Sequence, residues 1–229
     1  MRLRRLSVMT NLIKLSLTYE QIAKEKITDN YAWHKKAWEL FQHHPELKLR
    51  RNRPESEKGP TPFLSRYTAK SQHVELLVVS DFEPQMPNWC TEQTWRVVTI
   101  SNEFLSQPTY QFDLYANPTK AIKKPNGQGG FTKNRQRLTW LDEFSQTKWL
   151  IRKSASHGFI VRDDFPLKLD KPVDHRFNKN GEKGLHIGVR FQGILEVTDH
   201  EKFKRAFREG IGSAKGFGFG LLLIKPLRI

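Results

Sequence analysis

The sequence has little of what a disulfide-stapled, metal-bound or membrane-spanning protein requires. Its one cysteine, Cys90, excludes an internal disulfide framework and any site built on several cysteines. HExxH and paired CxxC patterns are absent and no paired Asp/Glu constellation stands out, so we expect neither a metal nor a cofactor. No apolar run reaches about 18 residues, so we expect no membrane span. The lack of disulfides fits a cytoplasmic protein.

Acidic residues are also scarce relative to basic ones. The chain of 229 residues has 24 Asp and Glu against 39 Lys and Arg, which gives a formal net charge of +15. Such a field attracts polyanions and makes their binding salt-dependent. The 15 Phe and 6 Trp residues are enough to fill real cores, so a folded protein is expected. A basic surface without a partner is the alternative.

The first half of the chain reads as one helix and several strands. Its start is basic and then apolar, but polar residues interrupt the apolar part and no small-residue cleavage site follows, so we expect a strand and not a signal peptide. The stretch from Lys48 to Pro62 is predicted to be an exposed loop. The predicted elements are a strand at Leu6–Leu17, a helix at Asp29–Phe41 and strands at Phe63–Thr68, His73–Val79, Trp95–Ile100 and Tyr110–Ala116.

Residues 117–137 are rich in Lys, Gly, Asn and Pro, and we interpret them as a domain boundary or a mobile loop. We therefore predict two domains, residues 1–118 and residues 119–229. The second half shows helix and strand patterns much like the first, so the chain is predicted to be α+β, with two tandem ferredoxin-like (RRM-related) domains. Its predicted elements are a helix at Leu141–His157, a hairpin at Asn180-Gly181, a strand at Leu185–Val197, a helix at His200–Glu209 and a strand at Phe219–Leu227.

A glycine-rich stretch, EGIGSAKGFGFGLL, runs from Glu209 to Leu222. Glycine lets a backbone approach a partner closely, and such turns present N–H groups to phosphate. In so basic a chain we expect contact with RNA, while a tight connection whose glycines only ease packing is the alternative. The GxxxxGK[ST] spacing of a P-loop is absent. The residues we expect to contact RNA here are Gly210, Gly212, Lys215, Gly216, Gly218 and Gly220.

Tyr31 and His34 lie three residues apart on the predicted first helix, so their side chains point from one surface. Histidine moves protons near neutral pH, and a tyrosine hydroxyl can orient a phosphate or a sugar hydroxyl. RNA carries its own nucleophile, the 2′-hydroxyl, so an enzyme can cleave it without metal by handling protons and holding the phosphate in line. An ordinary helix surface is the alternative.

Basic residues form several separate clusters along the chain. Phe131, Phe177 and Phe217 lie near some of them or near glycines, the mix expected when phosphate contacts combine with base stacking. Arg176 and Lys179 are placed on the predicted hairpin, where they could reach into a groove of a structured RNA. The other cluster residues that we expect to bind RNA are Lys133, Arg135, Arg137, Arg152 and Lys153.

With these residues laid out, the chain resembles the CRISPR repeat-processing endoribonucleases of the type I-E class, the CasE subunits of Cascade. The most specific match is FQGILEVTDHEKFKRAFREGIGSAKGFGFGLLLIKPL, from Phe191 to Leu227. YAWHKKAWELF near the start and YQFDLYANPTK in the middle match in the same order.

The resemblance implies two ferredoxin-like domains and metal-independent cleavage of the repeat stem-loop in precursor CRISPR RNA. It assigns catalysis to His34 and Tyr31, with 2′-hydroxyl attack leaving a 5′-hydroxyl and a 2′,3′-cyclic phosphate. It also implies retention of the processed guide RNA, assembly with other Cascade subunits and a monomer outside that complex. The alternatives are a non-catalytic RNA-binding subunit and, after it, a generic binder of double-stranded nucleic acid.

Overall fold

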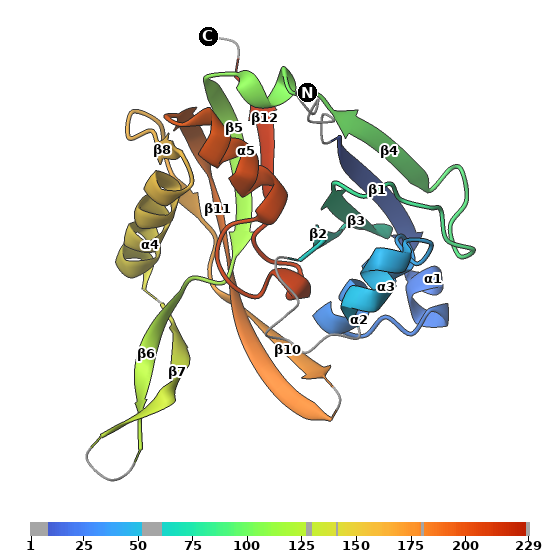
Figure 1. The fold of residues 1–229 in the computed structure, drawn as a ribbon, viewed down its shortest axis with the longest axis horizontal. Helices are drawn as coiled ribbons and strands as arrows, with labels where there is room; N and C mark the ends of the chain where they lie inside the picture. The colour runs from blue at the N-terminus through green and yellow to red at the C-terminus, as the bar shows by residue number, and fades with distance from the viewer. Residues whose placement is uncertain (1–8, 52–60, 127–129, 141, 180, 228–229) are drawn as a thin grey trace, which may run out of the picture.

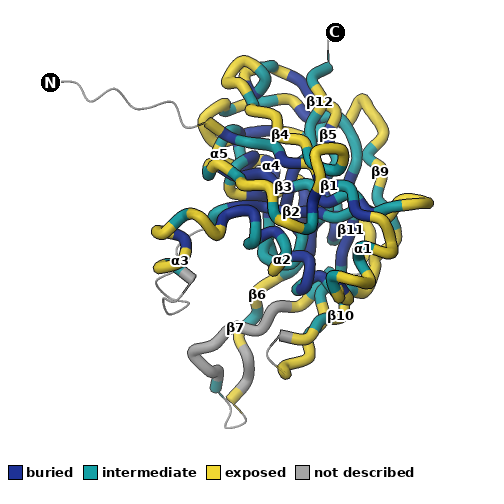
Figure 2. The backbone as a smooth tube through the Cα atoms, turned by 90° about the vertical axis from the view of Figure 1, so that its right-hand side faces the viewer, coloured by how far each residue is buried: buried dark blue, intermediate teal, exposed yellow. Residues whose placement is uncertain are grey.

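A computed structural model describes residues 9–51, 61–126, 130–140, 142–179 and 181–227. Two antiparallel sheets lie side by side with helices packed on them, and a two-stranded hairpin extends from the second (Figure 1). Buried residues follow the strands through the interior, whereas turns and hairpins are more exposed (Figure 2). Within this described part, no helix has both the length and the apolar character needed to cross a membrane.

The first sheet and its helices come from the N-terminal part of the chain. The elements are β1 (Thr10–Thr18), α1 (Tyr19–Lys24), α2 (Asn30–Glu39), α3 (Pro45–Arg51), β2 (Phe63–Ala69), β3 (His73–Ser80) and β4 (Trp95–Ile100). The strand order is β2-β3-β1-β4. Apolar residues alternate along β1, so Ile13, Leu15 and Leu17 join Trp33 and Ala37 of α2 in one buried cluster.

The predicted helix and strands of this sheet are confirmed, with shifts of one or two residues at most ends. The loop predicted from Lys48 to Pro62 is wrong at its start, because Pro45 and Glu46 open a helix that continues to Arg51. Proline suits a first helical turn, and a glutamate there complements the helix dipole. Residues 52–60 of that loop, and the predicted strand residues before residue 9, lie outside the described part.

The second sheet has the order β10-β11-β5-β12, and two short strands, β8 and β9, pair with β11. Tyr110, Phe112 and Phe191 of its strands pack with Trp149 and Phe203 of the two helices. The predicted helices, hairpin and last strand are confirmed. The elements are β5 (Thr109–Ala116), α4 (Glu143–Ser156), β8 (Phe159–Val161), β9 (Lys168–Leu169), β10 (Val173–Lys179), β11 (Glu182–Val197), α5 (His200–Glu209) and β12 (Leu222–Pro226).

One strand lies in a different sheet from the one that the sequence predicts. A division at residue 118 places Tyr110–Ala116 in the first unit, but β5 is a central strand of the second sheet, between β11 and β12. The chain crosses between the sheets at residues 101–108, through the short 3₁₀ turn η2 (Phe104–Ser106). β5 belongs there because its buried residues pack with α4 and α5. We therefore propose that the two units divide at residues 101–108 and not at residue 118.

The segment predicted as a boundary or mobile loop forms a two-stranded hairpin, whose register shifts between Lys123 and Pro125. β6 (Thr119–Pro125) and β7 (Phe131–Thr139) pair antiparallel and project from the second unit (Figure 1). The prediction is wrong because these strands carry mostly polar residues and lack the alternating apolar face by which strands are recognised. With this correction, the fold is α+β with two tandem ferredoxin-like units.

A buried ion-pair cluster and an apolar cluster join the two units. Arg66 of β2 lies 2.7 Å from Asp113 of β5, which also binds Arg190 of β11. Burial alone would raise the pKa of Asp113, but the hydrogen bonds from Arg190 and the charge of Arg66 lower it. The apolar cluster combines Leu64 and Val79 of the first sheet with residues around α5 and β12.

Asp113→Asn should lower the free energy of unfolding by about 3 kcal/mol at neutral pH, because it leaves the Arg66 guanidinium buried without its counter-charge. The wild-type contribution exists above the usual aspartate pKa of 3.8 and is lost as the pH falls through the lowered folded pKa, so the difference should shrink in acid. Denaturant titrations at neutral and acidic pH measure it. Asp164→Asn, in the exposed pair with Arg162, is the matched control and should have little effect; equal losses would contradict the prediction.

Candidate active site

The first two turns of α2 carry Tyr31 and His34, the two residues predicted to be catalytic. Asp29 caps this helix, since its side chain accepts a hydrogen bond from the backbone N–H of Ala32 at 2.8 Å. Trp33 turns into the core of the first unit, whereas Tyr31 and His34 are half-buried. The structure thus places both predicted residues at the helix end that meets the second unit.

His34 has a defined orientation. Its Nε2 accepts a hydrogen bond from the Trp38 indole at 3.0 Å, and its ring packs 5.3 Å from the ring of Phe63. An indole N–H only donates, so in the neutral histidine Nε2 carries the lone pair and Nδ1 carries the proton. Trp38 also packs edge-on against Phe63, at 5.2 Å between ring centroids. The histidine is therefore held on two sides by aromatic groups.

The glycine-rich loop closes the other side of this site. It follows α5, contains the 3₁₀ turn η3 (Lys215–Phe217) and leads into β12. A Cβ placed on Gly216 would lie 3.4 Å from Cε1 of His34, so the loop backbone lies directly against the imidazole. The ring of Phe217 lies 6.0 Å from that of Tyr31. The proposed catalytic helix of one unit and the loop of the other thus form one site.

The glycines of the loop fall into two groups. Gly210 and Gly220 are buried, and a Cβ on Gly220 would lie 2.7 Å from the carbonyl oxygen of Ile211. Both have positive φ, at 77° and 86°, which only glycine adopts readily. Gly212 and Gly216 instead line an open pocket, and Gly218 borders a second pocket on the joint between the units. The first two glycines therefore shape the loop. The other three are half-buried and border pockets, and Gly212 and Gly218 also have positive φ, at 93° and 85°.

The open pocket has a volume of about 460 Å³ and lies between the loop, the base of the β6–β7 hairpin and β11. Its lining is polar on the hairpin side, where Thr119 and Thr139 face it, and includes Lys215 on the loop side. Burial lowers the pKa of Lys215, and the nearby charge of Lys153 lowers it further, while Glu209 opposes both. The charges of two predicted RNA-binding lysines, one from α4 and one from the loop, thus act on the same region.

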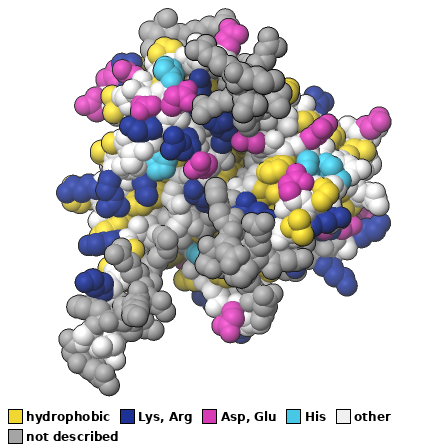
Figure 3. Space-filling view, viewed as in Figure 1, with side chains coloured by type: hydrophobic (Ala, Val, Ile, Leu, Met, Phe, Trp, Pro, Cys, Tyr) yellow, Lys and Arg dark blue, Asp and Glu magenta, His cyan; other side chains and the backbone are white. Residues whose placement is uncertain are grey.

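The remaining predicted RNA-binding residues lie on α4 and on the two hairpins. Arg152 is exposed on α4 and Arg176 is exposed on β10. Lysine and arginine side chains gather over α4 and the start of the β6–β7 hairpin (Figure 3). Some predicted side chains lie outside the described part although their strands lie within it, namely those of Lys133, Arg135, Arg137 and Lys179.

An aromatic cluster that the sequence analysis did not assemble supports the loop. The ring of Phe177 on β10 lies 4.4 Å from that of Phe217 and 4.8 Å from that of His186. Phe177 is paired with Gly184 across the hairpin, where any Cβ would lie 2.2 Å from the phenyl ring. Lys179 pairs with Glu182. A two-residue hairpin loop predicted at Asn180-Gly181 implies this register, so the Phe177–Gly184 pair could have been found from the sequence.

Among the described residues, no group of three or more His, Cys, Asp or Glu side chains is arranged to hold a metal ion. What the site offers is a histidine, a tyrosine, lysine charges and a glycine backbone beside an open pocket. This set can move a proton and can hold a phosphate.

The chain is similar in sequence to known proteins. The family described as CRISPR associated protein matches residues 11–226. The Cascade subunit CasE of Escherichia coli is 31% identical over 217 residues, covering 90% of this chain and 96% of CasE. The endoribonuclease Cse3 of Thermus thermophilus is 27% identical over 123 residues, covering 51% of this chain and 55% of Cse3.

Two solved structures show the same fold. One is Thermus thermophilus Cse3 bound to an RNA that represents a pre-cleavage complex. It has a TM-score of 0.69 at 22% identity, and the match covers 95% of this chain and 100% of Cse3. Cas6e of Escherichia coli gives 0.66 at 23% identity, with coverages of 95% and 100%. The chain therefore belongs to the CRISPR-associated protein family that includes the CasE subunit of Cascade.

Proposed function

We propose that this chain is an endoribonuclease that cleaves the repeat stem-loop of precursor CRISPR RNA without a metal ion. The observation that carries the proposal is the position of His34, which lies on α2 with its ring against the backbone of Gly216 and beside Tyr31. Its relatives are named a Cascade subunit and a CRISPR-associated endoribonuclease, and both names support this activity.

In the proposed reaction, the 2′-hydroxyl of the nucleotide before the cleaved bond attacks the adjacent phosphorus. A new O–P bond forms, the bond to the 5′-oxygen breaks, and the products are a 2′,3′-cyclic phosphate and a 5′-hydroxyl. His34 takes up the hydroxyl proton or, once protonated, gives a proton to the leaving oxygen. Either role requires Nε2 to leave its hydrogen bond with Trp38, because Nδ1 already carries the proton of the neutral ring. Tyr31 orients the phosphate or the sugar. The glycine-rich loop and Lys215 stabilise the charge that gathers on the phosphate oxygens.

The stem is bound by the basic residues around the pocket. Arg152, Lys153 and Arg176 supply phosphate contacts on α4 and β10, and Gly212, Gly216 and Gly218 allow the RNA backbone to come close. The remaining contacts in the proposal come from Lys133, Arg135, Arg137 and Lys179. After cleavage the protein retains the guide RNA and assembles with other Cascade subunits in the cytoplasm. Outside that complex it is proposed to be a monomer.

His34→Ala should slow cleavage of a repeat stem-loop RNA by about 100-fold to 10,000-fold, the range that general acid–base catalysis contributes. Its affinity for RNA should change little, because the basic residues that carry binding remain. Denaturing gels measure the rate, and filter binding to a 2′-deoxy substrate measures the affinity.

Two controls accompany this test. Cleavage by the wild type should persist in EDTA and stop when the nucleotide before the cleaved bond is 2′-deoxy. Unchanged cleavage by His34→Ala would remove His34 from the mechanism, and loss of activity in EDTA would indicate a metal-dependent nuclease. Binding without any product would favour a non-catalytic RNA-binding subunit.

Trp38→Phe should slow cleavage by about fivefold, because it removes the hydrogen bond that orients His34, worth about 1 kcal/mol, and keeps the aromatic ring. Single-turnover rates at saturating protein measure this effect. Trp89→Phe is the matched control, since the Trp89 indole donates instead to Glu39 at 2.5 Å, near the far end of α2. Equal rate losses in the two variants would contradict the orienting role of Trp38.

A further inference from the structure

Asn30 occupies an unusual position at the joint between the two units. It is the first residue of α2, directly before Tyr31, and its exposed fraction is 5%. A buried asparagine on a helix is costly unless its amide is hydrogen-bonded. In the sequence, Asp29 and Asn30 are both candidates for the N-cap of this helix, and the structure gives that role to Asp29. The reaction proposed above does not use Asn30.

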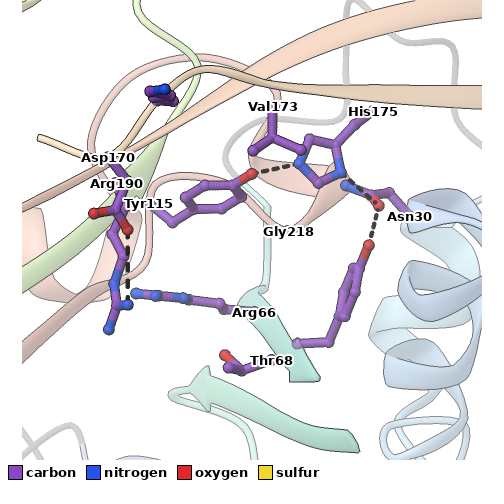
Figure 4. A pocket seen from close by; sticks show the side chains of 11 residues that line it. Asn30, Arg66, Thr68, Tyr115, Asp170, Val173, His175, Arg190 and Gly218 are labelled. Atoms are coloured by element: carbon purple, nitrogen blue, oxygen red, sulfur yellow. Dashed lines mark hydrogen bonds and ion pairs between the residues drawn. The ribbon is translucent and has the colours of Figure 1, made fainter. Parts of the chain in front are cut away.

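The amide of Asn30 contacts three different elements. Its Nδ2 donates to the backbone carbonyl of Phe217 in the glycine-rich loop at 2.9 Å. Its Oδ1 accepts from the Tyr67 hydroxyl of β2 at 2.6 Å and lies 3.3 Å from Nδ1 of His175 on β10. Asn30, Tyr67 and His175 lie along one side of a pocket of about 210 Å³ on the joint, and Arg66 and Arg190 lie on the other (Figure 4). The two partners on β10 and the loop belong to the second unit.

The direction of each hydrogen bond is fixed along this network. Burial lowers the pKa of His175, so its ring is neutral at pH 7. Oδ1 of Asn30 can only accept, so Nδ1 of His175 carries the proton and donates it, and in the neutral ring Nε2 then accepts from the Tyr115 hydroxyl. Nδ2 of Asn30 in turn donates to the carbonyl of Phe217. A side chain at this position must therefore accept from Tyr67 and His175 with one atom and donate to Phe217 with another.

Asp29 adds a second tie at the same helix end. While one oxygen of its carboxylate caps α2 at Ala32, the other accepts from the backbone N–H of Asn178 on β10 at 3.1 Å. Two consecutive residues thus dock the start of α2 on the second unit. Tyr31 follows immediately, and His34 is one helical turn further along.

We infer that Asn30 is a positioning residue, which holds the first turn of α2 in register with the glycine-rich loop so that Tyr31 and His34 face the phosphate that this loop binds. The catalytic part of this inference rests on the proposed function. Only Phe217 and Gly216 lie between Asn30 and His34 along this path of contacts. The bond to Phe217 fixes the residue next to Gly216, and Gly216 lies against His34. A misplacement of about 1 Å at such a site costs about 100-fold in rate.

Asn30→Asp is the sharpest test, because it keeps the shape and replaces the donor to Phe217 with a carboxylate oxygen. Two oxygens then face each other, and the loop should move away from α2. The rate of single-turnover cleavage of a repeat stem-loop RNA should fall by about 100-fold, with unchanged affinity for the 2′-deoxy RNA. Hydrogen–deuterium exchange of the backbone amides of residues 212–218, without RNA, should become faster.

Asn30→Ala removes the same bond without adding charge, and it carries the test if the aspartate variant does not fold. Tyr67→Phe removes one donor to Oδ1 but keeps the Phe217 bond, so it should leave loop exchange near the wild-type rate. Asn11→Asp is the matched chemical control. Asn11 lies on β1, and its side chain also donates to a backbone carbonyl, that of Phe82, at 3.4 Å. It should cleave as the wild type does.

Faster loop exchange together with a lower cleavage rate at unchanged affinity supports the inference. Unchanged loop exchange in both Asn30 variants would overturn it, and so would wild-type cleavage by them. Loop exchange does not depend on catalysis, so the two proposals fail separately. A wild type that does not cleave RNA would overturn the proposed function, and loop exchange would then decide the docking role of Asn30.

Discussion

The site depends on one constraint, which is that the first turn of α2 stays docked on a loop that belongs to the other sheet. His34 and Tyr31 come from the first unit, and Gly216 and Lys215 come from the second. Any change in the angle between the sheets separates these groups. The apolar cluster around Leu64 supplies the driving force for the joint, and burial of such side chains contributes roughly 1.5 to 3 kcal/mol each. The ion pairs of Asp113 fix how the two sheets are oriented at the joint. A buried ion pair contributes more to the specificity of a contact than to its stability.

Much of the fold could be predicted from the sequence, since periodic apolar patterns mark most helices and strands. α2 is predictable because Asp29 supplies a cap and because Trp33 and Ala37 are spaced for one buried face. β6 and β7 are not, because their sequences are mostly polar and lack the alternating apolar pattern by which strands are recognised. The sheet to which β5 belongs could not be predicted either. Its alternating residues show that it has a buried face, but not which helices cover that face.

The candidate site was predictable only in part. The spacing of Tyr31 and His34 puts them on one helix surface, and the glycines mark the loop, yet neither pattern shows that the two meet. The contacts of Asn30 were invisible for a different reason: its partners Phe217 and His175 are 187 and 145 residues away along the chain. The functions of the glycines also divide in a way that composition does not reveal. Gly210 and Gly220 are buried, so their role is to form the turn.

The chain passes from the first sheet to the second only once within the described residues, at 101–108. Everything else that joins the two units in this described part is non-covalent, so their contact resembles a protein–protein interface whose partners share a tether. A short tether keeps the local concentration of each partner high for the other, and this replaces affinity that the interface itself would otherwise need. The joint can therefore remain small and polar around Asn30 without the site coming apart.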